Sequence, residues 1–402
     1  MRILHTSDWH VGRTLHGADL ADAVDAFFAW LLDVVEERGV DLVLVSGDLF
    51  DRAVPPIEAL GRTSRVLEDL TSRARVITTS GNHDGPARLG LFAPMLDQRL
   101  VVATDPLLIG RAVECGDAED GCLVYPLPYL EPDLVKQDLS DLPEEDGARP
   151  PLPRSHEAVI AAALRRVRAD LEERRSGGDL RPAIVMVHAF LAGGAPSDSE
   201  RDLEIGGVAS APVSLFDTLG GADAADLGLV YVAAGHLHRP QAVSGAKVPI
   251  RYSGSPIAYS FSEAGADKSV VLLDVDSDGA RIEVLPIPPF RRVAVLRGTI
   301  AELLDAPDPA LADAYCQVTV TDDARPERMV ARIRAVYPRA LVIQHDSAAR
   351  AAIPAGASSP SAREPREVAR DFFETVGARP LDDAEAAVVD GVWADIRKEA
   401  AK

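Results

Sequence analysis

Cysteine is scarce in this sequence of 402 residues, with single copies at positions 115, 122 and 316. Their number is odd and none stands in a C-x-x-C spacing, which argues against a disulfide framework and against a zinc site built on cysteine. We therefore expect Cys115, Cys122 and Cys316 to be free thiols.

Long apolar runs are also missing. The start of the chain holds no uninterrupted apolar segment of the kind found in export signals, and no stretch approaches the roughly 18 apolar residues of a membrane span. With 47% hydrophobic and 26% charged residues, the composition is typical of a soluble globular protein. We expect a cytoplasmic protein without membrane contact, in which a catalytic domain carries smaller additions.

Positive charge is in short supply, since 42 Lys and Arg residues face 63 Asp and Glu residues and the formal net charge is −21. This balance argues against binding a nucleic-acid backbone through overall charge, because phosphate contacts normally come from Lys and Arg. Two routes to a phosphate-containing substrate stay open. Divalent ions held by carboxylates can supply local positive charge, or a partner subunit can supply a basic groove.

The first third of the chain alternates between apolar runs and helical patterns. Residues 2–6, 41–46 and 75–80 read as buried strands, and residues 20–38 and 57–72 between them place apolar side chains at helical spacing. This alternation predicts an α/β sheet. We expect a surface loop at 132–153, a helix at 155–175, and further strands at 122–125, 183–187, 229–233, 248–252 and 269–275.

The prolines of PIPPF at 286–290 predict a domain boundary, because proline cannot sit in a central strand. We therefore divide the chain into a domain at 1–290 and a small unit at 291–346 with strands at 292–299, 315–321 and 341–344 and a helix at 326–336. A Ser-, Ala- and Pro-rich linker is expected at 347–365. Two amphipathic pieces in 366–402 have too little apolar surface for a domain and are expected to dock on a partner.

Five polar segments follow predicted strands, which is where α/β sheets place their sites. They are Asp8-Trp9-His10, Gly47-Asp48, Gly81-Asn82-His83-Asp84, His188 and Gly235-His236-Leu237-His238. Carboxylate and amide oxygens suit a hard divalent ion, and a transition ion such as manganese also accepts imidazole nitrogen. Two ions about 3.5–4 Å apart need a carboxylate between them, and Asp48 is the natural bridge.

Each of these fragments has an ordinary interpretation when taken alone. A D-x-H or H-x-H is usually a surface or cap feature, Asp48 could cap a helix, G-N-H-D could be a turn, and His188 could be a core histidine. Their joint occurrence favours a metal site. It uses five of the nine histidines, and the others, which are His5, His16, His156 and His345, are expected to be structural or solvated.

In this order, D-x-H, G-D, G-N-H-D, H and G-H-x-H resemble the calcineurin-like metallophosphoesterase superfamily. A finer resemblance, over most of residues 1–290, is to the SbcD family of nuclease subunits. It rests on MRILHTSDWHVGRTLHG, VSGDLFD, TTSGNHD, AGHLHRPQ and RYSGSPIAYSF. The resemblance implies a two-sheet sandwich flanked by helices, with a small α+β capping domain and a C-terminal helical tail.

The resemblance also implies the ligand sets of two divalent ions, expected to be Mn²⁺. One ion would be held by Asp8, His10, Asp48 and His238, and the other by Asp48, Asn82, His188 and His236. His83 would not be a ligand. It would face the scissile phosphate and stabilise charge or protonate the leaving oxygen, which the near-neutral pKa of imidazole allows.

Three further residues are candidates for the site, each with a plainer alternative. Archaeal and eukaryotic relatives carry a histidine where this chain has Asp51, whose carboxylate could hydrogen-bond His83 or merely cap the next helix. Arg52 could contact substrate phosphate or be solvated, and Ser255 could lie in a loop beside the metals or in an ordinary turn. Trp9 could stack on a base or wedge its loop against the core.

The function implied is that of a DNA nuclease subunit, an exonuclease on double-stranded ends and an endonuclease on hairpins. It would form a homodimer and act with an SbcC-type coiled-coil ATPase in DNA repair, recombination and replication. One alternative is a cyclic-nucleotide or other small-molecule phosphodiesterase, which would not need the region after residue 290. Another is a catalytically silent scaffold, but such relatives usually lose ligands and here no ligand position is vacant.

Overall fold

A computed structural model describes residues 1–144, 148–200, 210–220, 226–305, 307–346, 367–368, 370–373 and 379–400. The chain divides into a first unit, Met1–Val293, and a second unit, Ala294–Lys402, which we describe separately. Among the described residues, no helix combines the length and the apolar character needed to cross a bilayer.

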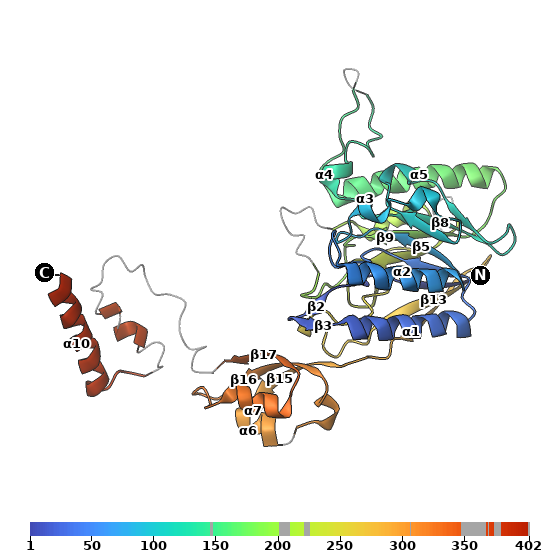
Figure 1. Cartoon of the computed structure of the whole chain (residues 1–402). Coiled ribbons are helices and arrows are strands. Elements are labelled where there is room, and N and C mark those ends of the chain that lie inside the picture. Colours follow the sequence, from blue (N-terminus) through green and yellow to red (C-terminus); the bar gives the residue numbers. More distant parts are fainter. Residues whose placement is uncertain are drawn as a thin grey trace. The chain divides into compact units, whose positions relative to one another are not determined.

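Two six-stranded sheets form the first unit (Figure 1). The first sheet has the order β14 (Gly279–Pro286), β13 (Ser269–Asp276), β1 (Arg2–Thr6), β4 (Leu42–Val45), β5 (Arg75–Thr79) and β6 (Leu100–Ala103). The second has the order β11 (Gln241–Val243), β12 (Ile250–Tyr252), β10 (Leu229–Gly235), β9 (Ala183–His188), β8 (Cys122–Leu127) and β7 (Val113–Cys115). The central strands of both sheets run parallel, so their carboxyl ends share an edge within each sheet.

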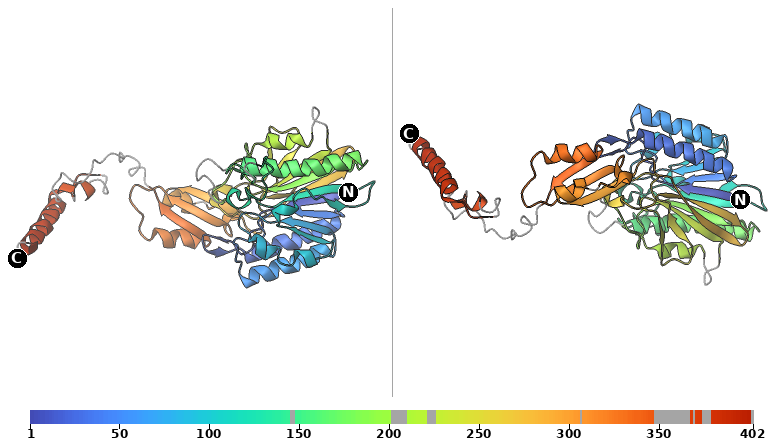
Figure 2. Two further views of the ribbon diagram at one scale, coloured as in Figure 1. Left: turned by 90° about the horizontal axis from the view of Figure 1, so that it is seen from above. Right: turned by 90° about the horizontal axis from the view of Figure 1, so that it is seen from below.

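The sheets pack face to face, and helices cover their outer faces (Figure 2). Alternate residues of one strand serve two cores, because successive side chains point to opposite faces. Leu44 packs between the sheets with Ile184 of the other sheet, whereas its neighbour Val43 packs outward in the cluster that contains Phe27 of α1 (Ala21–Glu37). α2 (Ile57–Thr71) shares this outer core. α5 (His156–Ser176), capped by the Ser155 hydroxyl, covers the second sheet. The predicted two-sheet sandwich flanked by helices is therefore confirmed.

The remaining elements of this unit are short and join the main strands. They are β2 (Thr14–Leu15), β3 (Ala18–Asp19), α3 (Pro86–Leu89), η1 (Ala93–Met95), η2 (Pro106–Leu108), α4 (Pro132–Val135), η3 (Val213–Thr218) and η4 (Phe261–Glu263). The prediction of a surface loop at 132–153 is wrong for some of its apolar residues. Leu134 is 76% exposed, but Val135, at the end of α4, and Leu139 and Leu152 beyond it are buried in the core that α5 covers.

In the second unit, β15 (Val293–Gly298), β16 (Tyr315–Val320) and β17 (Ala340–His345) form a three-stranded sheet in that order. β16 and β17 are parallel and joined through α7 (Met329–Val336), and Ile333 of α7 is fully buried against Val318 and Val320. α6 (Ile300–Asp305), η5 (Pro309–Leu311) and α10 (Asp383–Ala400) complete the elements. The predicted linker at 347–365 lies outside the described residues.

Candidate metal centre

Eight polar residues predicted for the site leave the carboxyl ends of five strands. Asp8 and His10 follow β1, Asp48 follows β4, and Asn82 and His83 follow β5, while His188 ends β9 and His236 follows β10. His238 continues the last of these loops. All of these residues except Asn82 are buried. The loops therefore bring the predicted ligands together inside the protein.

The backbone at this edge is strained. Asp8, His10, Asp48 and His236 have φ angles of 54°, 43°, 52° and 109°, in a region that non-glycine residues rarely adopt. Hydrogen bonds between the loops hold the conformation, among them Asp8 N to Gly47 O at 3.1 Å and His10 N to Asp48 O at 3.0 Å. Such strain concentrates at functional sites, where it aims side chains that a relaxed backbone would turn away.

One group of ligand atoms surrounds His10. Its Nε2 lies 3.0 Å from His238 Nε2 and 3.5 Å from Asp48 Oδ2. Asp8, His10 and His238 each offer a ligand atom, and these atoms lie within 4.8 Å of one another. Two imidazole nitrogens and carboxylate oxygens facing one another in a buried space form a donor set that suits a divalent cation.

A second group surrounds Asn82. Its Oδ1 lies 3.0 Å from His188 Nε2 and 3.2 Å from His236 Nδ1. His188 Nε2 is also 3.4 Å from Asp48 Oδ2, the same oxygen that approaches His10. Because His188 Nδ1 donates to the Ser46 carbonyl at 2.9 Å, the lone pair of Nε2 faces the site. Asp48 thus lies between both groups.

The protonation states suit a cation as well. Burial lowers the pKa of His10 and His238 well below the ordinary value and that of His236 to about 3, so these imidazoles are neutral and can bind metal through nitrogen. Burial raises the pKa of Asp8 to about 7. Burial also acts to raise the pKa of Asp48, but the surrounding histidines, His188 foremost, outweigh it and hold that pKa well below its usual range. Burial acts to lower the pKa of His188, but the Asp48 carboxylate outweighs it and raises that pKa to about 9, so an ion at this position would displace a proton. The centre therefore combines the neutral rings of His10, His236 and His238 with the charged, buried carboxylate of Asp48, which fits a bound divalent ion.

Two glycines let the loops approach each other this closely. A Cβ at Gly81 would lie 2.1 Å from Asp48 Oδ1, and a Cβ at Gly47 would lie 2.3 Å from His188 Nδ1. Any larger residue at either position would displace a predicted ligand, which explains both glycines of the G-D and G-N-H-D segments.

His83 lies beside His10 and Asp48, and its ring nitrogen is within 4.8 Å of their ligand atoms. Its main-chain N–H donates to Asp48 Oδ1 at 2.8 Å, and its ring meets the His10 ring edge to face with centroids 4.6 Å apart. His83 Nδ1 lies 2.8 Å from the main-chain carbonyl of Asp51. A carbonyl can only accept, so Nδ1 carries the hydrogen in this hydrogen bond.

The prediction that the Asp51 carboxylate orients His83 is corrected by this geometry. Its main-chain carbonyl makes the hydrogen bond, while the carboxylate oxygens lie 3.7 Å from Arg13 Nε and 3.4 Å from Arg52 Nη2. Arg52 has a side chain 62% exposed, so it stays a predicted substrate contact. The backbone turn after β4 brings the carbonyl, and not the side chain, toward the ring.

Ser255 and Trp9 also have roles that the structure clarifies. Ser255 was predicted to contact substrate, but it is fully buried and its hydroxyl donates to the Ile257 carbonyl at 2.8 Å, so it holds its own loop. Trp9 is buried, donates from Nε1 to Thr6 Oγ1 at 3.1 Å and packs against Phe28 of α1. It wedges its loop against the core and does not stack on a substrate base.

Comparison with known protein families identifies the family to which this chain belongs. Residues 1–240 match the family model described as calcineurin-like phosphoesterase. The chain belongs to the calcineurin-like phosphoesterase family. Residues 289–376 match a second model, described as the Type 5 capsule protein repressor C-terminal domain.

Among curated proteins, this phosphoesterase is similar to the SbcD subunit of the nuclease SbcCD from Bacillus subtilis (strain 168), with 34% identity over 285 residues. The match covers 68% of this chain and 66% of that protein, just under two thirds of the relative's length. The resemblance predicted from the motifs is confirmed.

Two solved structures also match. TT1561 of Thermus thermophilus is 15% identical with a TM-score of 0.38, and the match covers 71% of this chain and 99% of that protein. A dimetal phosphatase from Danio rerio is 13% identical with a TM-score of 0.41, and the corresponding shares are 72% and 96%. Likenesses at these scores carry no argument about function.

Asp84 supports the phosphoesterase centre in a way that the sequence did not reveal. Its two carboxylate oxygens accept hydrogen bonds from the main-chain N–H groups of Leu49, Phe50 and Gly81, at 3.2, 3.0 and 2.9 Å. These groups belong to the loops that carry Asp48 and Asn82. Asp84 therefore ties the two loops together, and the only hint in the sequence is its place beside His83.

A second group missed by the sequence reasoning fixes the ring of His238. His238 Nδ1 lies 2.6 Å from the Ser199 hydroxyl, which donates to Glu263 Oε1 at 2.7 Å. Glu263 in turn accepts a hydrogen bond from the buried Lys268. With its own hydrogen directed at Glu263, Ser199 must accept from His238, so Nδ1 carries the hydrogen and Nε2 is free for a metal.

We predict that Ser199→Ala weakens metal binding at the His238 group by about 10- to 100-fold and leaves the Asn82 group unchanged, because the ring loses the acceptor that sets its tautomer. Mn²⁺ titration followed by calorimetry measures both affinities, and the ¹⁵N shifts of His238 report the tautomer directly. The control is Ser197→Ala, which removes a neighbouring hydroxyl 2.8 Å from that of Ser199. Equal affinities in Ser199→Ala and the wild type would contradict the assignment.

Proposed function

We propose that this chain is a nuclease subunit that hydrolyses DNA phosphodiester bonds with two divalent ions, expected to be Mn²⁺. The observation that carries the proposal is the Asp48 carboxylate, one oxygen of which lies within 3.5 Å of both His10 Nε2 and His188 Nε2. The likeness to a curated nuclease subunit supports DNA as the substrate.

In this proposal Asp8, His10, Asp48 and His238 hold one ion, and Asp48, Asn82, His188 and His236 hold the other. When bound, the pair supplies positive charge against the phosphate oxygens and activates water for attack at phosphorus. The protein contributes geometry that is fixed in advance, through the loop hydrogen bonds and buried rings described above.

His83 is proposed as the general acid. The Asp51 carbonyl keeps the hydrogen on Nδ1 and so fixes the tautomer and orientation of the ring. When the ring is protonated, its Nε2 proton can pass to the leaving oxygen while Nδ1–H stays with the carbonyl. The main chain of His83 is bonded to Asp48, so the acid is held in register with the proposed bridge.

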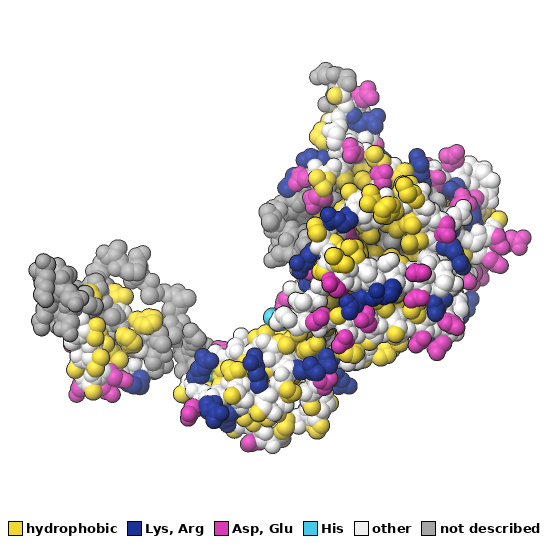
Figure 3. Space-filling view, viewed as in Figure 1, with side chains coloured by type: hydrophobic (Ala, Val, Ile, Leu, Met, Phe, Trp, Pro, Cys, Tyr) yellow, Lys and Arg dark blue, Asp and Glu magenta, His cyan; other side chains and the backbone are white. Residues whose placement is uncertain are grey.

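Exposed arginines in the second unit supply local positive charge for DNA binding by a chain whose net charge is negative. Arg325, Arg328, Arg332 and Arg334, on or next to α7, are all exposed. Figure 3 shows basic side chains on the visible face of this unit. Local clusters of arginine can meet a phosphate backbone even when the net charge of the chain is −21. This supports a polymeric substrate over a small phosphodiester.

The test of the proposal is digestion of linear duplex and hairpin DNA with Mn²⁺, run beside a cyclic nucleotide. We expect the duplex to shorten from its ends and the hairpin to be opened, with no reaction in a chelator. Exclusive hydrolysis of the cyclic nucleotide would favour the small-molecule phosphodiesterase. Failure with every substrate, despite two bound ions, would favour the silent scaffold.

A partner ATPase of the SbcC type is proposed for the C-terminal segment. Phe372, Phe373, Val388 and Val392 expose 59%, 50%, 66% and 56% of their surfaces. Apolar side chains exposed to this extent on short amphipathic pieces are typical of a segment that packs on a partner. Together with the likeness to a subunit of a two-part nuclease, this supports a role in DNA repair, recombination and replication.

A homodimer is proposed through an apolar patch on the first unit, made of Ile57, Leu60, Leu91, Phe92 and Met95. These residues are 83%, 42%, 62%, 62% and 81% exposed. The carboxyl-terminal half of α2 and Met95 border a common cavity, so the segment around η1 lies beside α2. Figure 3 shows apolar side chains gathered over this region. A patch of large apolar residues on a folded domain is typical of an interface between subunits.

We predict that Phe92→Glu combined with Met95→Glu weakens dimerisation by about 10³-fold, because central apolar anchors contribute about 2 kcal/mol each. Light scattering during size-exclusion chromatography measures the mass at graded concentrations. Leu180→Glu, at an exposed leucine outside the patch, is the control and should stay dimeric. A double variant with an unchanged dissociation constant would place the interface elsewhere.

A further inference from the structure

Two of the three cysteines face each other at the edge of the second sheet. Cys115 ends β7 and Cys122 begins β8, and the two residues are direct partners in the antiparallel pairing of these strands. Both are free and buried. Opposite residues in an antiparallel pair have Cα atoms about 4.5–5.5 Å apart, which lies within the range of about 4.4–6.8 Å that a disulfide bridges.

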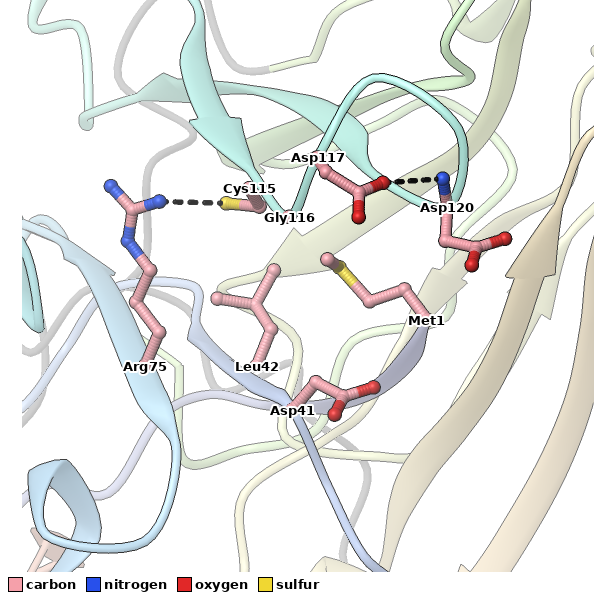
Figure 4. A pocket seen from close by; sticks show the side chains of 8 residues that line it. All are labelled: Met1, Asp41, Leu42, Arg75, Cys115, Gly116, Asp117 and Asp120. Atoms are coloured by element: carbon pink, nitrogen blue, oxygen red, sulfur yellow. Dashed lines mark hydrogen bonds between the residues drawn. The ribbon is translucent and has the colours of Figure 1, made fainter.

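A cavity of about 610 Å³ opens onto Cys115 (Figure 4). Met1, Leu42 and Arg75, which also line it, stand at the amino ends of β1, β4 and β5. The metal centre uses the carboxyl ends of the same strands, so this cavity lies at the opposite edge of the sheet. A small solute can reach it without entering the proposed active site.

The two thiols have different surroundings. Arg75 Nη1 lies 3.5 Å from Cys115 Sγ, a contact drawn in Figure 4. Interaction with the Cys122 thiol and the charges of Arg75 and Arg181 lower the pKa of Cys115 against the effect of burial. Interaction with Cys115 and burial raise the pKa of Cys122, whose thiol donates to the Met1 sulfur at 3.6 Å. Cys115 is therefore the thiol that ionises and reacts first.

The hairpin between the cysteines is closed tightly. A Cβ at Gly116 would lie 2.7 Å from Met1 Cε, and a Cβ at Gly121 would lie 2.4 Å from the Cys115 carbonyl oxygen. The two glycines allow the chain to return within six intervening residues and hold both cysteines side by side. A bond between the sulfurs would need little movement of the backbone.

We propose that Cys115 and Cys122 form a peroxide-reactive thiol pair that closes reversibly into a cross-strand disulfide. The Cys115 thiolate attacks one oxygen of hydrogen peroxide, the O–O bond breaks, and a sulfenic acid forms while hydroxide leaves and becomes water. Cys122 then attacks the sulfenic sulfur, gives its proton to the departing hydroxide and releases a second water. Two thiols are oxidised and one peroxide is reduced to two waters.

Cys316 provides a matched internal control. It is buried in the second unit, its thiol lies 3.5 Å from the Ala314 carbonyl, and burial raises its pKa. It shares the solvent and the oxidant with the pair but lacks an arginine at its sulfur among the described contacts. It should react at least about tenfold more slowly than Cys115, since the rate follows the fraction of thiolate.

The experiment treats the full chain with hydrogen peroxide, traps the remaining thiols with an alkylating reagent, and maps the peptides by mass spectrometry. We expect a Cys115–Cys122 linked peptide, two hydrogens lighter than the reduced pair, which a dithiol reverses, while Cys316 stays alkylated. Cys122→Ser should accumulate the sulfenic acid at Cys115, detected with a dimedone probe. Arg75→Gln should slow disulfide formation by about tenfold.

Three outcomes would overturn the proposal. They are oxidation of Cys316 as fast as that of Cys115, a wild-type rate no higher than that of the chain unfolded in denaturant, and no linked peptide in a protein whose circular dichroism is native. Because the readout is a covalent bond, the result does not depend on nuclease activity.

Discussion

Replacing Asp48 by asparagine is expected to lower turnover about 10³-fold or more and to leave at most one ion bound per chain. One oxygen of Asp48 lies 3.5 Å from His10 Nε2 and 3.4 Å from His188 Nε2, so it is the charged atom shared by both ligand groups. An amide keeps the shape but loses the charge that offsets two closely spaced cations, and a bridging position is worth several kcal/mol.

Metal analysis after gel filtration measures the stoichiometry of Asp48→Asn, and single-turnover digestion of duplex DNA measures its rate. The matched control is Asp51→Asn, which removes a carboxylate three positions away that contacts Arg13 and Arg52. Because the Asp51 main chain orients His83, this control should keep both ions, and the acidic limb of its pH profile should not move. Two tightly bound ions in Asp48→Asn would refute the bridge.

The second large effect is expected for His83→Ala, which should lose about 10²- to 10⁴-fold in rate while binding both ions as tightly as the wild type. The main-chain N–H of His83 donates to Asp48 Oδ1 and survives the substitution, while the ring contact with His10 is lost. The substitution removes the imidazole, whose Nδ1 donates to the Asp51 carbonyl.

Two affinity measurements separate a loss of catalysis from a loss of metal or DNA binding. Manganese affinity by calorimetry and DNA affinity by fluorescence anisotropy should both stay near the wild-type values in His83→Ala. A variant that loses an ion would make His83 a ligand, and a variant that keeps full activity would leave the proton transfer to another group.

Most of the central strands and the polar residues at their ends could be predicted, because an apolar run and the motif that follows it are adjacent in the sequence. A buried run such as residues 2–6 ends in a D-x-H segment, and the structure has β1 at the same residues. All four edge strands of the two large sheets were missed. β6, β7 and β11 have only three or four residues, which carry too little periodicity, and β14 is largely exposed and so lacks a buried apolar run. α4 and Leu152 were misread because polar neighbours hide a few inward-facing side chains.

The finer contacts of the centre could not be predicted, because they depend on which atom of a residue faces which loop. The side chain of Asp51 was the natural candidate for His83, yet the turn presents the carbonyl. Ser199, Glu263 and Lys268 come from separate segments with no common spacing, and meet only because the loops after β9 and before β13 close over His238. No sequence pattern within one segment predicts these contacts.

Four predicted ligands hold a left-handed backbone, and each such residue costs about 1–3 kcal/mol. Together this is of the same order as the roughly 5–15 kcal/mol by which a domain typically resists unfolding. The strained loops hold the ligand side chains in place before an ion binds. Their cost lowers the free energy of unfolding of the metal-free protein. Chelation of bound divalent ions should therefore lower the melting temperature of the first unit and make it more sensitive to protease.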